Sequence, residues 1–382
     1  MNRRDFVGGV GTTVGAATIP LPAATFTPTM RLAVVCPQTG MDAAVGRQLV
    51  MGVRAAVDYY NNIRSPFDRA LLYEAYDDRN TASDAVVQAS FATGNPDTLA
   101  TIGHLSAAST LAALPSYNSA QMPLVVPTVT DDRLTSQGYR NVFRLPTKDS
   151  DEGGLVAQYA IATGSKAPHV VTQDGDYGPA VAAGFVRRAG ALHLSAAQTS
   201  FSVDKPNYDK AAADVLAHAP DCVVFAGNVD DMGPLLPMLR AKGYTARFMA
   251  TQGFFDGLTV SQYGKESEGM VVSSSVPYYP LAPTTTRDVS DYAAHYGPLT
   301  PVAAYGYAAV QVIMLAQRRT LAASRLLMTR ALATGGAYDT VTGSYTFGAS
   351  GDPFDANCYF YVVRDGKFAY DRQAHRSGFM LR

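Results

Sequence analysis

The sequence has few of the side chains from which metal centres and nucleophilic sites are built. Its 382 residues include only three cysteines, and Cys36, Cys222 and Cys358 lie far apart in the chain. The six histidines are scattered, and none forms a metal-binding motif with another histidine or a cysteine. We therefore expect no metal and no cofactor. Cys36 and Cys222 fall in apolar runs and are expected to be small core residues.

The common catalytic signatures are also missing. The chain has no G-x-S-x-G turn and no Gly-rich phosphate loop ending in Gly-Lys-Ser/Thr. Three pairs of adjacent aspartates, at 77–78, 131–132 and 230–231, leave acid–base catalysis open as an alternative. Aspartate is also preferred at helix N-termini and loop ends, where these pairs fall. We expect a binding protein rather than an enzyme.

The chain lacks an excess of charge of either sign. Its formal net charge is −1, and no basic tract stands out. Nucleic acids and anionic membrane surfaces attract clustered lysine and arginine. The balance of charge therefore gives no reason to expect either partner.

The N-terminal residues differ from the rest. Arg3-Arg4 precede a weakly apolar stretch that runs to about Ile19 and is followed by Pro20-Leu21-Pro22. This stretch is too short and too polar to span a bilayer as a helix. It resembles a twin-arginine export signal, so we assign residues 1–28 to a cleaved signal and expect a periplasmic protein.

The remaining chain is long enough for two domains of the usual 100–200 residues or so. Short apolar runs alternate with segments of helical periodicity, and this alternation restarts after residues 147–150. Such a β-α-β pattern predicts parallel sheets with helices on both faces. Strands are expected at residues 30–36, 71–76, 99–102, 122–126, 169–173, 192–197, 222–226, 248–251, 270–274, 341–347 and 359–363. Single helices are expected at 230–241 and at 292–316.

One stretch, from Thr98 to Ala113, indicates where a ligand would bind. A buried strand ends at Gly103, and Ser106 is placed to cap the Ala/Leu-rich helix that follows. Such a turn presents free backbone N–H groups at the carboxyl edge of a sheet. Ligands of open α/β sheets bind at this edge. An anionic or hydroxyl group is expected to anchor at residues 106–109.

An ordered set of short phrases resembles the periplasmic solute-binding proteins of the branched-chain amino acid (Leu/Ile/Val) type. The phrases include Tyr76-Asp77-Asp78, Ile102-Gly103-His104-Leu105, Asp174 with Tyr177-Gly178, and Glu268-Gly269-Met270. The resemblance implies two Rossmann-like, doubly wound lobes, a hinge of three crossings, and a ligand in the cleft between the lobes. It places the N-terminal lobe at 30–148 plus 277–350 and the C-terminal lobe at 149–276 plus 351–382.

The resemblance also assigns a pocket, most of which has changed in this chain. Thr130 and Tyr177 match residues of the amino-acid binders and are expected to face one cleft from opposite lobes. Five other positions differ in residue type: Val45, Ala107, Asn228, Gln252 and Ala304. The cysteine pair often found in the first lobe is replaced by Asn80 and Ser106. Ser106, Ser109, Thr128 and Phe254 complete the expected site, and Phe254 and Phe255 are expected as exposed-edge aromatics near its mouth.

These changes predict a different ligand. Gln252 stands where the family has the acid that neutralises the ligand ammonium, and a buried ammonium without a counter-charge is costly. The smaller side chains predict a roomier, more apolar wall. We expect a bulky, largely apolar or neutral ligand, such as an aromatic amide or a lipid- or sterol-like ring system. Amino-acid binding with altered specificity, and a sensor that signals to a membrane or regulatory partner, remain as alternatives to a transport role.

Overall fold

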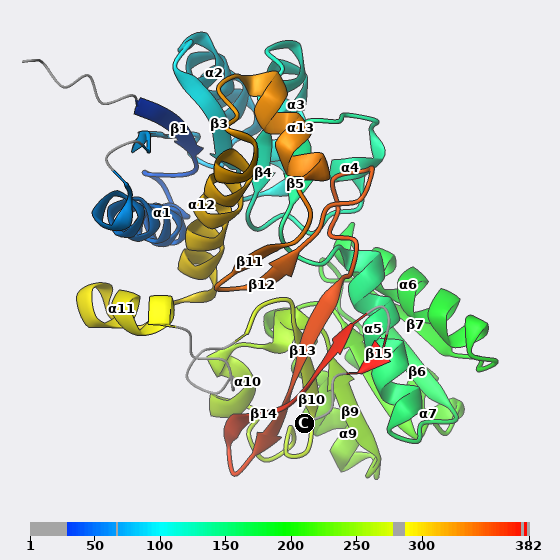
Figure 1. The fold of residues 1–382 in the computed structure, drawn as a ribbon. Coiled ribbons are helices and arrows are strands. Elements are labelled where there is room, and N and C mark those ends of the chain that lie inside the picture. Colours follow the sequence, from blue (N-terminus) through cyan, green and yellow to red (C-terminus); the bar gives the residue numbers. More distant parts are fainter. Residues whose placement is uncertain (1–28, 66–67, 278–286, 376–377, 380–382) are drawn as a thin grey trace, which may run out of the picture.

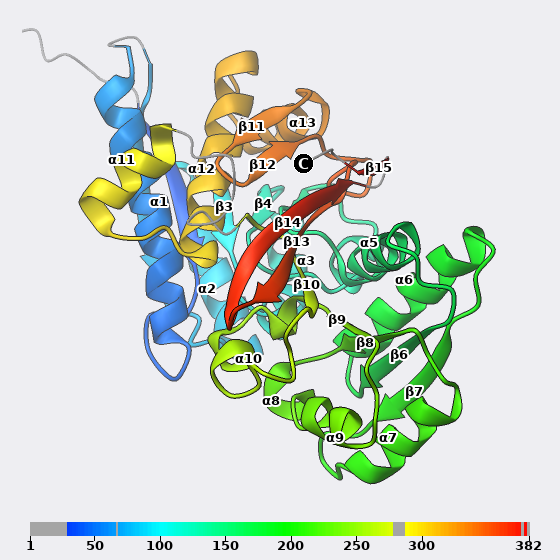
Figure 2. The ribbon, with the colours of Figure 1, turned by 90° about the horizontal axis from the view of Figure 1, so that it is seen from below.

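The computed structural model describes residues 29–65, 68–277, 287–375 and 378–379. The assigned export signal, residues 1–28, lies outside this part of the chain. Two lobes are visible, one holding the blue-to-cyan elements and the other the green ones (Figure 1). The same lobes are seen from below in Figure 2, with the long β13–β14 ribbon running across the second one.

The first lobe contains a parallel sheet of five strands in the order β2-β1-β3-β4-β5. The strands are β1 (Thr29–Val35), β2 (Ala70–Tyr76), β3 (Thr98–Gly103), β4 (Leu124–Val126) and β5 (Val142–Arg144). The helices between them are α1 (Ala43–Ile63), α2 (Ala82–Gly94), α3 (Ala107–Ser119) and α4 (Arg133–Ser136).

Later residues complete this lobe. They form α11 (Arg287–Tyr296), α12 (Pro301–Thr320), α13 (Arg325–Thr334) and a hairpin of β11 (Tyr338–Thr340) and β12 (Gly343–Tyr345). Helix α12 packs directly on α1, because a Cβ on Gly52 would lie 1.9 Å from the Ala303 carbonyl oxygen. Only glycine allows this approach. One apolar core therefore joins residues from both ends of the chain.

The second lobe repeats the first strand order. Its parallel strands run β7-β6-β8-β9-β10, and an antiparallel extension, β13-β14-β15, continues the sheet beyond β10. The strands are β6 (Pro168–Gln173), β7 (Ala197–Phe201), β8 (Cys222–Ala226), β9 (Arg247–Ala250), β10 (Val271–Ser274), β13 (Asn357–Arg364), β14 (Lys367–His375) and β15 (Gly378–Phe379).

The helices of this lobe are α5 (Asp149–Ala162), α6 (Tyr177–Ala191), α7 (Tyr208–Ala217), α8 (Val229–Met232), α9 (Leu235–Ala241) and α10 (Gly257–Ser261). A single 3-10 turn, η1 (Gln252–Phe254), follows β9. Helix α6 packs closely on α5, because a Cβ on Gly184 would lie 1.9 Å from the Ser150 carbonyl oxygen. This contact fixes the start of α5 against α6.

Three segments connect the lobes: the one after β5, the one after β10, and the one between β12 and β13. The first and third are joined, since the Thr147 hydroxyl donates to the Asn357 carbonyl at 2.6 Å. The buried Arg144 guanidinium donates to Asp352 Oδ1 of the third segment at 2.8 Å and to the Asp131 carbonyl at 2.8 Å. The segment between β12 and β13 is thus held to the end of β5 by Arg144.

Some predicted elements differ from the observed ones. A single helix expected at 230–241 is two, α8 and α9, because Gly233-Pro234 interrupts it and proline lacks the N–H for the helical ladder. The strand expected at 341–347 is instead a hairpin whose turn lies at residues 341–342. The strand expected at 192–197 occurs at Ala197–Phe201, and the helix expected at 292–316 is divided into α11 and α12.

Candidate ligand-binding site

A cavity of about 420 Å³ lies between the lobes at the carboxyl ends of their parallel strands. In the first lobe, Thr128 and Thr130 follow β4, and Pro146 follows β5. In the second lobe, Tyr177 follows β6 and Asn228 follows β8. The volume is within the range of about 300–1,000 Å³ that small-molecule sites have, and the sheet edge is where α/β folds bind ligands.

The remaining walls come from β9, β10 and the start of α12. These residues are Gln252, Gly253, Phe255, Ser274, Ser275, Val276, Pro301, Val302 and Tyr305. No charged side chain is among the lining residues in the described part of the chain. The wall is therefore neutral at its surface and more polar than the sequence predicted.

A buried carboxylate lies behind this neutral wall. Glu152, in the first turn of α5, is 2% exposed. Its Oε1 accepts hydrogen bonds from the Gln252 backbone N–H (3.0 Å) and the Ser273 hydroxyl (2.6 Å), and its Oε2 accepts from the Tyr177 hydroxyl (2.9 Å). The pKa of Glu152 is raised, because the effect of burial outweighs that of these three hydrogen bonds, which lower it. Both carboxyl oxygens are engaged by protein donors.

A second buried carboxyl group lies one turn earlier. Asp149 is 3% exposed, and its Oδ1 has no hydrogen-bond partner. Burial raises the Asp149 pKa to about 7, and the nearby charge of Glu152 adds to the rise, against a hydrogen bond from the Thr130 hydroxyl that lowers it. Both acids lie under the cavity wall rather than on it, so neither carboxyl group is among the residues that a ligand would touch.

The side chain of Gln252 is held from the first lobe. The Tyr305 hydroxyl, on α12, donates to Ser275 Oγ at 3.1 Å, and the Ser275 hydroxyl donates to Gln252 Oε1 at 3.0 Å. Because the amide oxygen is occupied in this way, the amide nitrogen is the end left to donate to a ligand. Residues of α12, of the segment after β10 and of η1 therefore together determine how the Gln252 amide is oriented.

The turn after β3 is fixed by a separate buried network. His104 Nδ1 lies 2.5 Å from Asp78 Oδ2, and His104 Nε2 lies 3.0 Å from the Tyr117 hydroxyl. All three residues are fully buried. The Thr128 hydroxyl donates to the Leu105 carbonyl at 2.9 Å, which joins the ends of β3 and β4. The network of Asp78, His104 and Tyr117 stabilises this turn within the first lobe.

The structure brings together five of the expected site residues: Thr128, Thr130, Tyr177, Asn228 and Gln252. Thr130 and Tyr177 come from opposite lobes. Phe255, expected beside them, also lines the cavity. The resemblance to the amino-acid binders pointed to Thr130, Tyr177, Asn228 and Gln252 in the sequence, and in the structure each of them follows the end of a strand.

The other six expected residues do not line this cavity. Phe254 was expected to be an exposed-edge aromatic and is instead fully buried, stacked on Phe225 with ring centroids 5.4 Å apart, because η1 turns it inward. Ala304 is fully buried in α12, and Val45 is an exposed residue of α1. Ser106 caps α3 by accepting from the Ser109 N–H, and Ala107 and Ser109 follow it in the first turn.

Several functional residues were not expected from the sequence. Glu152 was missed because acids at 149, 151 and 152 are typical of a helix N-terminus. The helical period offered a signal, since Glu152 shares a face with Val156 and Ala160, both buried. Ser275 and Tyr305 carry no such signal, because only the fold brings α12 beside the second crossing.

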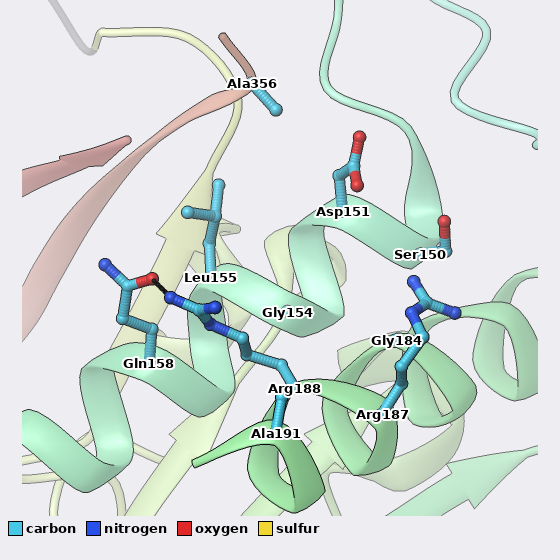
Figure 3. A pocket seen from close by; sticks show the side chains of 10 residues that line it. All are labelled: Ser150, Asp151, Gly154, Leu155, Gln158, Gly184, Arg187, Arg188, Ala191 and Ala356. Atoms are coloured by element: carbon cyan, nitrogen blue, oxygen red, sulfur yellow. Dashed lines mark hydrogen bonds between the residues drawn. The ribbon is translucent and has the colours of Figure 1, made fainter. Parts of the chain in front are cut away.

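Two other cavities are less suited to a ligand, one because of its size and the other because of its position. One, of about 230 Å³, lies between α5 and α6, where Arg188 already donates to Gln158 at 2.7 Å (Figure 3). A larger one, of about 570 Å³, lies between the β11–β12 hairpin and the antiparallel strands β13 and β14. The first is smaller than most ligand sites, and the second is not at the carboxyl ends of parallel strands.

Within the described residues, no group of three His, Cys, Asp or Glu side chains is arranged to hold a metal ion. None of the described helices combines the length and apolar character needed to cross a membrane.

Comparison with known proteins gives a consistent result. The leucine-specific-binding protein of Salmonella typhimurium is 26% identical over 328 residues, which cover 85% of this chain and 88% of that protein. The ABC transporter substrate-binding protein of Desulfitobacterium hafniense, solved in complex with Leu, has a TM-score of 0.76 at 22% identity and covers 90% of this chain and all of that one.

A second similar structure carries a different kind of ligand. It is the solute-binding protein of an ABC transporter from R. palustris in complex with benzoate, with a TM-score of 0.69 at 17% identity over 92% of this chain and 96% of that one. The family model described as periplasmic binding protein matches residues 29–367. With two lobes of parallel sheet and an interlobe cavity at their strand ends, this chain belongs to the periplasmic binding protein family, whose members bind solutes rather than transform them.

Proposed function

We propose that this chain is the substrate-binding component of an ABC transporter and holds in its interlobe cavity a small molecule that is not a free branched-chain amino acid. The ligand has an apolar body and neutral polar groups. The observation that carries the proposal is a cavity at the ends of parallel strands from both lobes, lined by no charged side chain among the described residues. The names of the relatives support the transport role.

An amino acid brings an ammonium group, and the cavity wall offers it no free carboxylate. Gln252 occupies the expected position of the acid, and Glu152 behind it is already engaged by three protein donors. Moving an ammonium group out of water without a counter-charge costs several kcal/mol. This cost argues against leucine, isoleucine and valine as ligands.

Calorimetry with leucine, isoleucine and valine tests the proposal. We expect no measurable binding by the wild-type protein, and at least about tenfold tighter leucine binding by the Gln252→Glu variant. The exposed Gln262→Glu substitution, at the end of α10, is the matched control and should bind no leucine. Dissociation constants near 1 µM or below, ~8 kcal/mol of binding free energy, for the wild-type protein would overturn the proposal.

We further propose that residues 1–28 direct export of the folded chain to the periplasm and are then removed, the mature chain starting between Ala24 and Met30. The support is Arg3-Arg4 before a weakly apolar stretch. Changing both arginines to lysine should leave the precursor in the cytoplasm, as measured by fractionation. An unchanged periplasmic yield would contradict this proposal.

A further inference from the structure

The hydroxyl groups of the cavity share one property. The described lining contains six of them, on Thr128, Thr130, Tyr177, Ser274, Ser275 and Tyr305. A hydroxyl has a single proton to donate but two lone pairs that accept. The direction in which each proton points therefore decides whether the wall offers a ligand donors or acceptors.

Five of these six protons are directed into the protein. Three serve backbone or side-chain oxygens nearby: Thr128 donates to the Leu105 carbonyl (2.9 Å), Ser274 to the Val276 carbonyl (2.9 Å), and Ser275 to Gln252 Oε1 (3.0 Å). Tyr305 donates to Ser275.

The fifth proton goes to a buried acid, since Tyr177 donates to Glu152 at 2.9 Å. The hydroxyl groups of Thr128, Tyr177, Ser274 and Ser275 can then only accept a hydrogen bond from a ligand.

The side chain of Gln252 has the opposite polarity. Its oxygen is occupied by Ser275, so its nitrogen is the group that can donate. A ligand that matches these hydroxyl groups and Gln252 carries several N–H or O–H donors and one acceptor close to them. A carboxylate has acceptors only, so it can pair with the Gln252 N–H but leaves its other lone pairs facing those of the hydroxyl groups without protons, which is costly in a desolvated site.

We propose that the cavity selects its ligand by hydrogen-bond donors, and that the ligand class is a neutral molecule with a primary amide or several hydroxyl groups rather than a carboxylic acid. This inference rests on the proposed function, since it concerns the same cavity. It separates this chain from the R. palustris protein, whose structure contains benzoate.

A series with one apolar body and four head groups tests it: 3-phenylpropanamide, 3-phenylpropanol, 3-phenylpropanoate and 3-phenylpropylamine, with leucine as a fifth compound. Dissociation constants are measured by calorimetry on the full mature chain. We expect the amide to bind at least about tenfold more tightly than the acid. An acid that binds as tightly as the amide, or no binding by the amide, overturns the inference. Leucine binding overturns the proposed function instead.

Two variants connect the preference to the network. In Ser275→Ala the amide of Gln252 loses its fixed orientation, so the amide-to-acid ratio should fall severalfold. Ser90→Ala, on the exposed face of α2, is the matched control and should keep the ratio. In Glu152→Gln the new side chain can donate to Tyr177 and turn the phenol proton toward the cavity, which should also lower the ratio. An unchanged ratio in Ser275→Ala overturns the inference even if Glu152→Gln does not fold.

Discussion

In each lobe a buried acid behind the edge of the sheet contacts a network that includes a tyrosine, but the two networks differ in whether they include a residue of the cavity wall. In the first lobe, His104 lies between Asp78 and Tyr117, and all three are fully buried. In the second, Glu152 is satisfied by neutral donors, and one of them, Tyr177, lines the cavity. Similar side chains thus support the fold in one lobe and contact the ligand site in the other.

The difference teaches how to recognise a functional buried charge. The Asp78 carboxylate contacts a basic side chain, His104, and the network of Asp78, His104 and Tyr117 lies wholly within the core. The Glu152 carboxylate has no basic partner among the described residues, and its hydrogen bonds fix the orientation of groups that face the cavity. A buried acid held only by neutral donors at the carboxyl edge of a sheet is therefore the better indicator of a site.

Removing the histidine should give the largest effect and leave the ligand site intact. We expect His104→Ala to lower the free energy of unfolding by about 3–5 kcal/mol, because Asp78 loses its buried partner. Urea denaturation of wild type and variant measures the change. The amide-to-acid preference of the folded variant should stay the same. A loss of stability below about 1 kcal/mol would remove the distinction between the two networks.

A smaller, matched pair of substitutions sharpens the comparison. Tyr117→Phe and Tyr177→Phe each delete one hydroxyl that contacts a buried network. The first should lower the free energy of unfolding by about 1–2 kcal/mol without changing ligand affinity. The second should weaken binding of 3-phenylpropanamide about fivefold to tenfold, because a ligand donor loses its acceptor.

Denaturation and calorimetry on both tyrosine variants give the comparison directly. If the two changes altered affinity equally, the first-lobe network would belong to the binding site as well.

The fold could be predicted from the sequence because alternating apolar and helical segments determine parallel sheets. Site residues such as Thr130 and Gln252 were assigned by the resemblance to the amino-acid binders, whose pocket positions they match. What could not be found depended on contacts between distant segments. The orientation of Gln252 requires Ser275 and Tyr305, which meet it only when α12 folds back beside the second crossing.

Side-chain direction was the other limit. Phe254 and Phe255 are neighbours of the same type, yet η1 buries the first and turns the second toward the cavity. No local pattern distinguishes them, because a single 3-10 turn is too short to show a period.

The return of the chain to each lobe also determines when the molecule can fold. The core of the first lobe contains Leu32 and Val53 together with Ile313 and Phe347, and the core of the second contains Val170 together with Phe360 and Ala374. Domains usually complete in order as the chain is synthesised. Here the first core is not whole until Phe347 has left the ribosome, and the second is not whole until Ala374 has, so both lobes become native close to the end of synthesis.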